Sequence, residues 1–301
     1  MGTELLGNVL VDVTAYKADR NYTFFAVFTR ESVYANHTDY KYFEFTKNYA
    51  YSDPVDSSYN KTGSVISIAQ AYRVPEGALR GKITLPTHDP DGQPIIGVVG
   101  FNDDAAKNIT HLFVMPDNEI VEFQERAFDG HSESKLQYID FDNLTHLRSI
   151  QKYAFRYLDD LNLTSIPAPV VYIGTEAMNG SFERRGSIKT FSIAGSVTKM
   201  DSRAFAYCDI PIETLYVGGP GDPTQLDISG WNTSKAPFFT QNPHYRPKTL
   251  YIYCEPERMQ EFENAMQNFA DEGKAIFEIA WDVGGDEPLG QYFVKSANDY
   301  T

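Results

Sequence analysis

Cysteine is nearly absent from this sequence: only Cys208 and Cys254 occur among 301 residues. Two thiols exclude the small secreted scaffolds that are held together by many disulfides. Cys208 occupies the small-residue position that comes just after Ala204-Phe205 in the repeat, and Cys254 ends an apolar segment, so both are interpreted as buried structural thiols. A disulfide between them is the less favoured alternative, and the redox compartment stays open.

Basic residues are also scarce. The chain has 26 Lys and Arg against 41 Asp and Glu, which gives a net charge of −15 and a pI of about 4.8. Proteins that bind nucleic-acid phosphates need clustered Lys and Arg, so nucleic acid is excluded as a partner, and an anionic membrane surface is disfavoured. No apolar run approaches the roughly 20 residues that a membrane-spanning helix requires. The sequence therefore predicts no membrane insertion.

The motifs of catalysis and cofactor binding are missing too. The chain has no GxSxG for a nucleophilic serine, no CxxC or HxxxH cluster for zinc, and no P-loop. His88–Gly92 (HDPDG) lacks the remaining ligands of a calcium loop and is interpreted as a turn. Asp159 and Asp160 are the acids that a glycosidase would use, but neighbouring strand residues point apart. We expect a non-enzyme without cofactor or metal, with a glycosidase as the minor hypothesis.

What the sequence does contain is a repeat. Hydrophobic residues make up 42% and aromatic residues 14% of the chain, enough for a core. At intervals of about 27 residues an apolar residue is followed five places later by a large one: Ile96…Phe101, Phe123…Phe128, Ile150…Phe155, Ile173…Met178 and Met200…Phe205. A fixed period of this length is typical of a solenoid. Because one repeat cannot bury its own large residue, Phe101, Phe128, Phe155, Met178 and Phe205 are predicted to form one buried column.

A second pattern, LxxLxL, alternates with the first. It is found at Ile109-Leu112-Val114, Leu136-Ile139-Phe141, Leu158-Leu161-Leu163, Ile188-Phe191-Ile193 and Ile212-Leu215-Val217, and again in altered form at Leu250-Ile252. This pattern predicts a short strand with its leucine positions inward and its x positions outward. The IxxxAF segments are predicted to return the chain as a helical or 3-10 turn.

Two segments connect the repeat to a known family. Ser165–Met178 (SIPAPVVYIGTEAM) and Val197–Cys208 (VTKMDSRAFAYC) resemble the IPxxVxxIGxxAFxxC repeat of BspA-like leucine-rich repeats. The resemblance covers about two thirds of the chain, roughly residues 79–281. It implies a leucine-rich repeat solenoid and, because this family occurs in surface proteins of oral and gut bacteria, some protozoa and some phages, it implies recognition or attachment. It supplies no catalytic residues.

Residues 1–78 are interpreted as a β-rich domain that precedes a solenoid over residues 79–253. Strand-like alternation is found at Val9–Val13, Thr23–Phe28, Tyr40–Thr46 and Val65–Ala69. A solenoid needs its first repeat covered, so one role of this domain is a cap. The other role, docking into a larger assembly, stays equally open.

Residues 254–301 are predicted to form a C-terminal helix–strand cap and tail. Glu255–Gly273 has a helical stripe of Met259, Phe262, Met266 and Phe269, interpreted as core, and a closing strand is expected at Ala275–Trp281. Asp282–Thr301 is polar and is interpreted as an arm. Before the cap, Gly218–Pro247 is interpreted as a loop-like insertion rich in aromatic residues.

The outward strand positions give a candidate binding surface on the concave face of the solenoid. They include Asp159 and Asp160 on the third rung. Aromatic side chains beside acids and amides suit recognition of a protein or a glycan. With the insertion included, the candidate binding residues are Phe113, Tyr138, Asp140, Asn162, Tyr216, Trp231 and Tyr251.

Eight N-x-S/T sequons occur, at Asn21, Asn36, Asn60, Asn108, Asn143, Asn162, Asn179 and Asn232. Composition predicts about two, so glycosylation is one interpretation. The favoured one is that several of these asparagines serve the turns at strand entries.

The leading functional hypothesis is a non-catalytic recognition or attachment protein that binds a protein or glycan on a cell or particle. The alternative is a structural component of a large assembly, such as the tail or capsid of a phage virion, anchored through residues 1–78. No secretory signal is visible at the N-terminus. The expected location is therefore extracellular or cell-surface if a signal has been removed, and otherwise virion-associated.

Overall fold

A computed structural model describes residues 3–6, 9–12, 37–69, 74–75, 78–101, 104–130, 134–179, 189–201, 203–205, 212–229, 249–267 and 291–298. The chain forms two compact units, Met1–Ser32 and Val33–Thr301. In the first, β1 (Thr3–Leu6) pairs antiparallel with β2 (Val9–Asp12). The repeats lie in the second unit. The three-part division at residues 78 and 253 stays a prediction.

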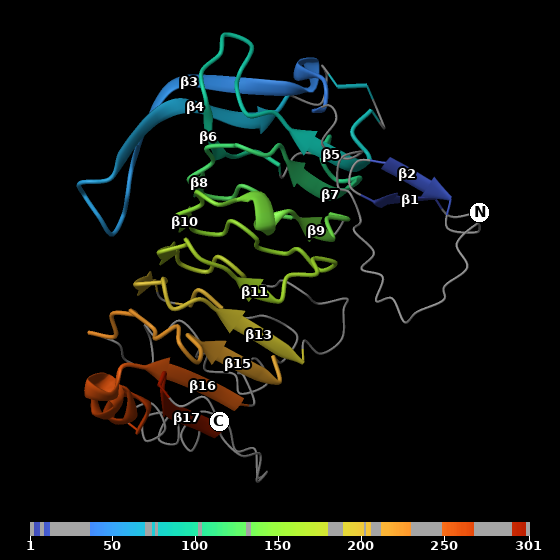
Figure 1. Cartoon of the computed structure of the whole chain (residues 1–301). Helices are drawn as coiled ribbons and strands as arrows, with labels where there is room; N and C mark the ends of the chain where they lie inside the picture. The colour runs from blue at the N-terminus through green and yellow to red at the C-terminus, as the bar shows by residue number, and fades with distance from the viewer. Residues whose placement is uncertain are drawn as a thin grey trace, which may run out of the picture. The chain divides into compact units, whose positions relative to one another are not determined.

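Two parallel ladders build the second unit (Figure 1). One is a seven-stranded sheet in the order β14-β12-β10-β8-β6-β4-β3. Its strands are β3 (Phe43–Ser52), β4 (Asn60–Ile68), β6 (Ile95–Val98), β8 (Glu122–Phe123), β10 (Ser149–Ile150), β12 (Tyr172–Ile173) and β14 (Lys199–Met200). From β4 onward each strand pairs in parallel with the corresponding strand of the next repeat.

The other ladder carries the LxxLxL strands. It consists of a three-stranded sheet, β5-β7-β9, and a five-stranded sheet, β11-β13-β15-β16-β17. The strands are β5 (Gly81–Leu85), β7 (Ile109–Val114), β9 (Tyr138–Ile139), β11 (Ser165–Ile166), β13 (Thr190–Ile193), β15 (Thr214–Val217), β16 (Thr249–Cys254) and β17 (Gln291–Ser296). All are parallel, as expected for a solenoid whose repeats stack in one direction.

The predicted core column is confirmed. Phe128, Phe155 and Met178 are at most 1% exposed, and Phe101 and Phe205 are also buried. The rings of Phe128 and Phe155 are stacked, with centroids 5.6 Å apart and planes 7° from parallel. The described leucine positions of the strands are buried in the same cluster, except that Phe141 is only partly buried. Neighbouring repeats thus bury what a single repeat would leave exposed.

The return segments differ from the prediction of helical or 3-10 turns. The first residue of each IxxxAF segment lies in or beside a strand of the seven-stranded sheet, and the chain then turns a tight corner. Corner residues hydrogen-bond from repeat to repeat: Phe128 N–H donates to Ala154 O at 2.8 Å, and Phe155 N–H donates to Ala177 O at 2.8 Å. Short strands form here instead of helical turns because their main-chain groups find hydrogen-bond partners in the neighbouring repeat.

One conformation recurs at the four described corners that carry Ala-Phe or Ala-Met. The residue just before Ala-Phe or Ala-Met has a positive φ although none is glycine: Arg126, Tyr153, Glu176 and Arg203, with φ between 52° and 59°. Left-handed backbone is uncommon for non-glycine residues. The corner is therefore held by the hydrogen bonds around it, such as Arg126 N–H to Lys152 O at 3.0 Å.

The hairpin β3–β4 continues the repeat sheet at its N-terminal end. β4 pairs with β6, the first strand that the repeats contribute to this sheet. Residues 43–68 therefore cover the edge of the first repeat, which supports the capping role. The hairpin also forms a second small core, because Tyr51 packs with Ile96 and Val121. The predicted strand Thr23–Phe28 lies outside the described residues.

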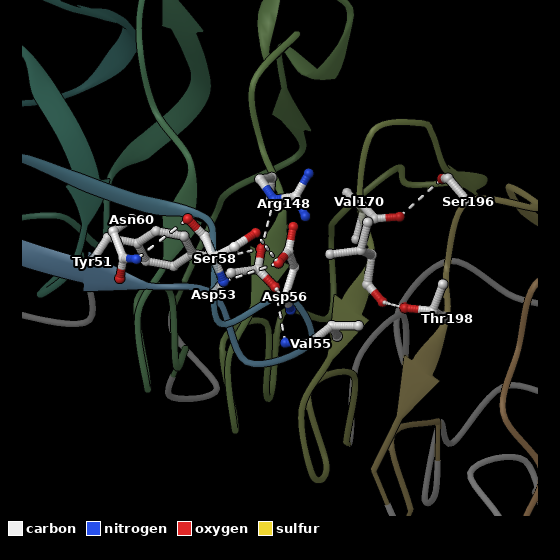
Figure 2. A network of polar contacts seen from close by, with 11 residues as sticks. Tyr51, Asp53, Val55, Asp56, Ser58, Asn60, Arg148, Val170, Ser196 and Thr198 are labelled. Atoms are coloured by element: carbon white, nitrogen blue, oxygen red, sulfur yellow. Dashed lines mark hydrogen bonds and ion pairs between the residues drawn. The ribbon is translucent and has the colours of Figure 1, made fainter.

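A polar latch fixes the hairpin loop to the third repeat (Figure 2). Asp53 has a fully buried side chain and accepts from Arg148 Nε at 2.5 Å. It also accepts from the backbone N–H of Val55 at 2.8 Å and of Asp56 at 2.9 Å. The Arg148 guanidinium lies 4.3 Å from the centroid of the Tyr59 ring. Burial alone would raise the pKa of Asp53, but these donors outweigh it, so the pKa lies below its ordinary value.

Asp53→Asn keeps the size of this side chain and removes its charge. We expect a loss of about 1–3 kcal/mol in unfolding free energy. Because the folded-state pKa is depressed, the stabilisation by the carboxylate is complete above its unfolded pKa of about 3.9 and is lost as pH falls through the lower folded value. Urea unfolding should therefore show a difference that is constant from about pH 5 to pH 8 and shrinks below about pH 4. Asp104→Asn, at an exposed position outside the latch, is the control; a difference independent of pH would contradict the latch.

The C-terminal part of the unit departs from two interpretations. Leu226 and Ile228 are buried, and Asp227 N–H donates to Thr198 O at 2.8 Å, so the start of the supposed insertion continues the repeats. The tail is not a free arm, since β17 pairs with β16 over six residues. Residues 259–267 are helical after the 3-10 turn η6 (Pro256–Arg258), and Phe262 and Met266 are buried as predicted. Residues 275–281, 208 and 269 lie outside the described residues.

Candidate aromatic recognition surface

Three aromatic side chains stack across the last strands of the five-stranded sheet. Register places Tyr216 of β15 opposite Tyr251 of β16, and Tyr251 opposite Phe293 of β17. The Tyr216 and Tyr251 centroids are 5.1 Å apart with planes 11° from parallel, and those of Tyr251 and Phe293 are 5.0 Å apart with planes 18° from parallel. We call these three residues the aromatic column. Figure 1 shows the three strands side by side.

The alternation of the strands turns this column outward. Leu215, Val217, Leu250 and Ile252, which flank the tyrosines, are buried. Tyr216 and Tyr251 are half-buried, and Phe293 is 39% exposed. Rings stacked in this way cover each other's faces, so they present mainly their edges and the tyrosine hydroxyls to a partner.

A second aromatic group lies on the three-stranded sheet. Phe113 and Tyr138 have centroids 5.5 Å apart, and His111 lies 5.8 Å from Tyr138. Burial, and secondarily the charge of Lys82, lowers the pKa of His111. The imidazole is therefore neutral near pH 7 and adds aromatic surface rather than charge.

The two groups do not form one continuous surface. Between them the outward positions are small or polar: Asn162 is exposed, and Ser165 and Ser192 face each other across β11 and β13. The aromatic column is thus limited to the C-terminal end of the sheet. Of the candidate binding residues, the structure brings Phe113 and Tyr138 together, and separately Tyr216 and Tyr251.

Two predicted outward positions are wrong. Asp140 is fully buried, because its carboxylate accepts from Asn143 Nδ2 at 2.7 Å beside the 3-10 turn η3 (Phe141–Asn143). Asp159 is 5% exposed, and residues 159–160 form a turn instead of a strand. Trp231 lies outside the described residues, so its role stays a prediction.

Phe293 is the residue that the sequence reasoning missed. It belongs to a short run, Tyr292-Phe293-Val294, inside a tail that was interpreted as polar. Three apolar residues between polar neighbours were the available signal, and they match the length of a short edge strand.

The described residues contain no group of three or more His, Cys, Asp or Glu side chains placed to hold a metal ion. Burial raises the pKa of the Cys254 thiol to about 11, so this free cysteine is a poor nucleophile. No helix in the described part of the chain is long and apolar enough to cross a membrane.

Comparison with known families identifies the repeat. Residues 93–211 match the model of the BspA type leucine-rich repeat region, in six copies. Repeats of this type are generally non-catalytic and are linked to protein recognition and adhesion at surfaces. Searches of curated proteins and of solved structures found no match.

Proposed function

Because residues 93–211 form a BspA-type leucine-rich repeat region, we propose that this protein is a non-catalytic recognition protein that binds a partner protein at a cell or particle surface. The observation that carries the proposal is the aromatic column of Tyr216, Tyr251 and Phe293. Tyrosine is among the residues that dominate interface energetics. Rings held on three paired strands lose little conformational entropy on binding.

The geometry of the column favours a protein partner over a glycan. Sugars stack on a free aromatic face, whereas each face between Tyr216, Tyr251 and Phe293 is covered by the next ring. The edges, the hydroxyls and the outer face of Phe293 that remain suit apolar side chains and backbone carbonyls. The net charge of −15 further favours a basic partner through long-range attraction.

We expect Tyr216→Ala combined with Tyr251→Ala to weaken partner binding about 100-fold or more, because each anchor contributes about 2 kcal/mol at the centre of an interface. The measurement compares the binding isotherms of labelled wild-type and variant protein on cells that bind the wild-type protein. Thr214→Ala with Thr249→Ala is the matched control, since these residues lie opposite each other on the same two strands. An unchanged isotherm for the tyrosine variant would remove the aromatic column from the proposal.

A component of a large assembly is the second candidate, favoured by the separate compact unit Met1–Ser32. Deletion of residues 1–78 is a poor test, because it also removes β3 and β4 from the repeat sheet. Deletion of residues 1–32 is the sharper one. If the chain that starts at Val33 enters a virion as well as the full chain does, anchoring through this unit is wrong. Both candidates place the protein on a cell surface, outside a cell or on a virion.

A further inference from the structure

We propose that the outer edge of β17 binds an extended segment of a partner protein, which adds to the five-stranded sheet as a further parallel strand. This edge is a different surface from the outward face that carries the aromatic column. Within the described residues, β17 is the last strand of its sheet and pairs only with β16. An open strand edge is a template for pairing with another chain.

The direction of the main-chain groups follows from one hydrogen bond. Ala297 N–H donates to Cys254 O of β16 at 2.9 Å. Since successive residues of a strand point their N–H and C=O groups to opposite sides, Phe293 and Lys295 share the direction of Ala297. The main-chain groups of Tyr292 and Val294 therefore point away from β16, along the outer edge.

A groove of about 520 Å³ runs along this edge. Residues 292–295 of β17 line one side, and the helical residues 259–267 supply the other wall: Gln260, Glu263, Asn264 and Gln267. The two walls are connected where Tyr292 Oη donates to Gln267 Oε1 at 3.2 Å. Gln260 Nε2 donates to Asn264 Oδ1 at 3.0 Å, and these two amides have further donor and acceptor capacity that an extended backbone can use.

The groove also indicates the composition of the segment. Phe293 is 39% exposed and ends the aromatic column, so an added strand would place its own side chain on the outer face of this ring. Glu263 on the helical wall and Lys295 on β17 give the groove one charge of each sign, so the preference for a basic side chain comes from the net charge of −15 acting at longer range. The occupant is thus an extended peptide that combines an aromatic or apolar residue with a basic one.

A second copy of this chain fits the groove less well. A symmetric dimer through β17 would bring the helix of residues 259–267 from each copy to the same edge. That helix already forms the far wall of the groove. A single strand from a partner meets no such obstacle.

The test uses the synthetic peptide KTLYIYK, acetylated and amidated, which places the sequence of residues 249–253 between lysines. Binding to the full chain is measured by isothermal titration, with a copy of the peptide that is N-methylated at alternate amides as control. Val294→Pro removes the outward N–H of the edge. Val294→Ala removes only side-chain atoms and keeps that N–H, so it is the matched control for packing, and thermal unfolding checks that both variants fold.

The expected result is that Val294→Pro weakens peptide binding at least about tenfold relative to Val294→Ala, and that the N-methylated peptide binds at least as weakly. Equal binding to the two variants, or no binding of KTLYIYK to the wild type, would overturn the proposal. Hydrogen exchange gives an independent outcome, since the amides of Tyr292 and Val294 should exchange fast in the free protein. Protection of these amides, or a dimer that Val294→Pro dissociates, would show that the edge already has another occupant.

Discussion

Gly174→Ala should destabilise the protein by about 3 kcal/mol, at the upper end of overpacking effects. A Cβ atom at this position would lie 2.6 Å from the backbone nitrogen of Lys152 and 2.8 Å from the carbonyl carbon of Gln151. Both atoms belong to the neighbouring repeat, and a backbone cannot move aside as a flexible side chain can. The strain must therefore separate two repeats whose strands β10 and β12 are paired.

The midpoint of urea unfolding, followed by circular dichroism, measures this effect. Gly219→Ala is the matched control, because a Cβ there would meet nothing within 4 Å. We expect the control to change the unfolding free energy by less than about 0.5 kcal/mol. Equal midpoints for the two variants would mean that the repeats do not approach as closely as the structure has them.

Phe155→Ala should cost about 3–5 kcal/mol, the range for a large aromatic side chain removed from a core. Phe155 is fully buried and lies at the centre of the core column, with Phe123 and Phe128 rings 5.6 Å away. The loss leaves a cavity between repeats that strand pairing on both sides prevents from closing.

Phe293→Ala is the control for Phe155→Ala, since it removes the same atoms from a position that is 39% exposed. Its expected effect on unfolding free energy is below about 1 kcal/mol. The two variants thus compare the loss of a phenylalanine ring from the core with the loss of the same ring from the surface. A similar loss for both variants would contradict the assignment of Phe155 to the core and of Phe293 to the surface.

The sequence predicted the buried half of the molecule better than the exposed half. Phe155 and Leu215 repeat because stacking demands an apolar residue at each such place, so periodicity reveals them. Asp140 sits at an x position of the same pattern, yet it is buried, because a neighbouring amide makes a hydrogen-bond partner available. Pattern alone cannot show such a partner.

The site was partly predictable for a similar reason. Tyr216 and Tyr251 were found as outward positions of recognisable strands, whereas Phe293 belongs to a strand that no repeat motif marks. The stacking of the three rings depends on strand register, which is a property of tertiary pairing. The latch between Asp53 and Arg148 joins residues 95 positions apart, a distance over which sequence patterns carry no information.

The left-handed corner residues have a consequence for how this chain can change. Arg126, Tyr153, Glu176 and Arg203 share one backbone conformation but have chemically different side chains, none of them fully buried. The corner therefore constrains φ and leaves the side chain open, so charge and aromaticity can vary there, one position per repeat, without altering the stack. β-Branched residues are disfavoured there because they rarely adopt a positive φ. Proline is excluded, because its ring fixes φ near −65° and removes an N–H that Arg126 and Tyr153 donate to the next repeat. These corners form a row of regularly spaced places where new surface chemistry can be introduced by single substitutions.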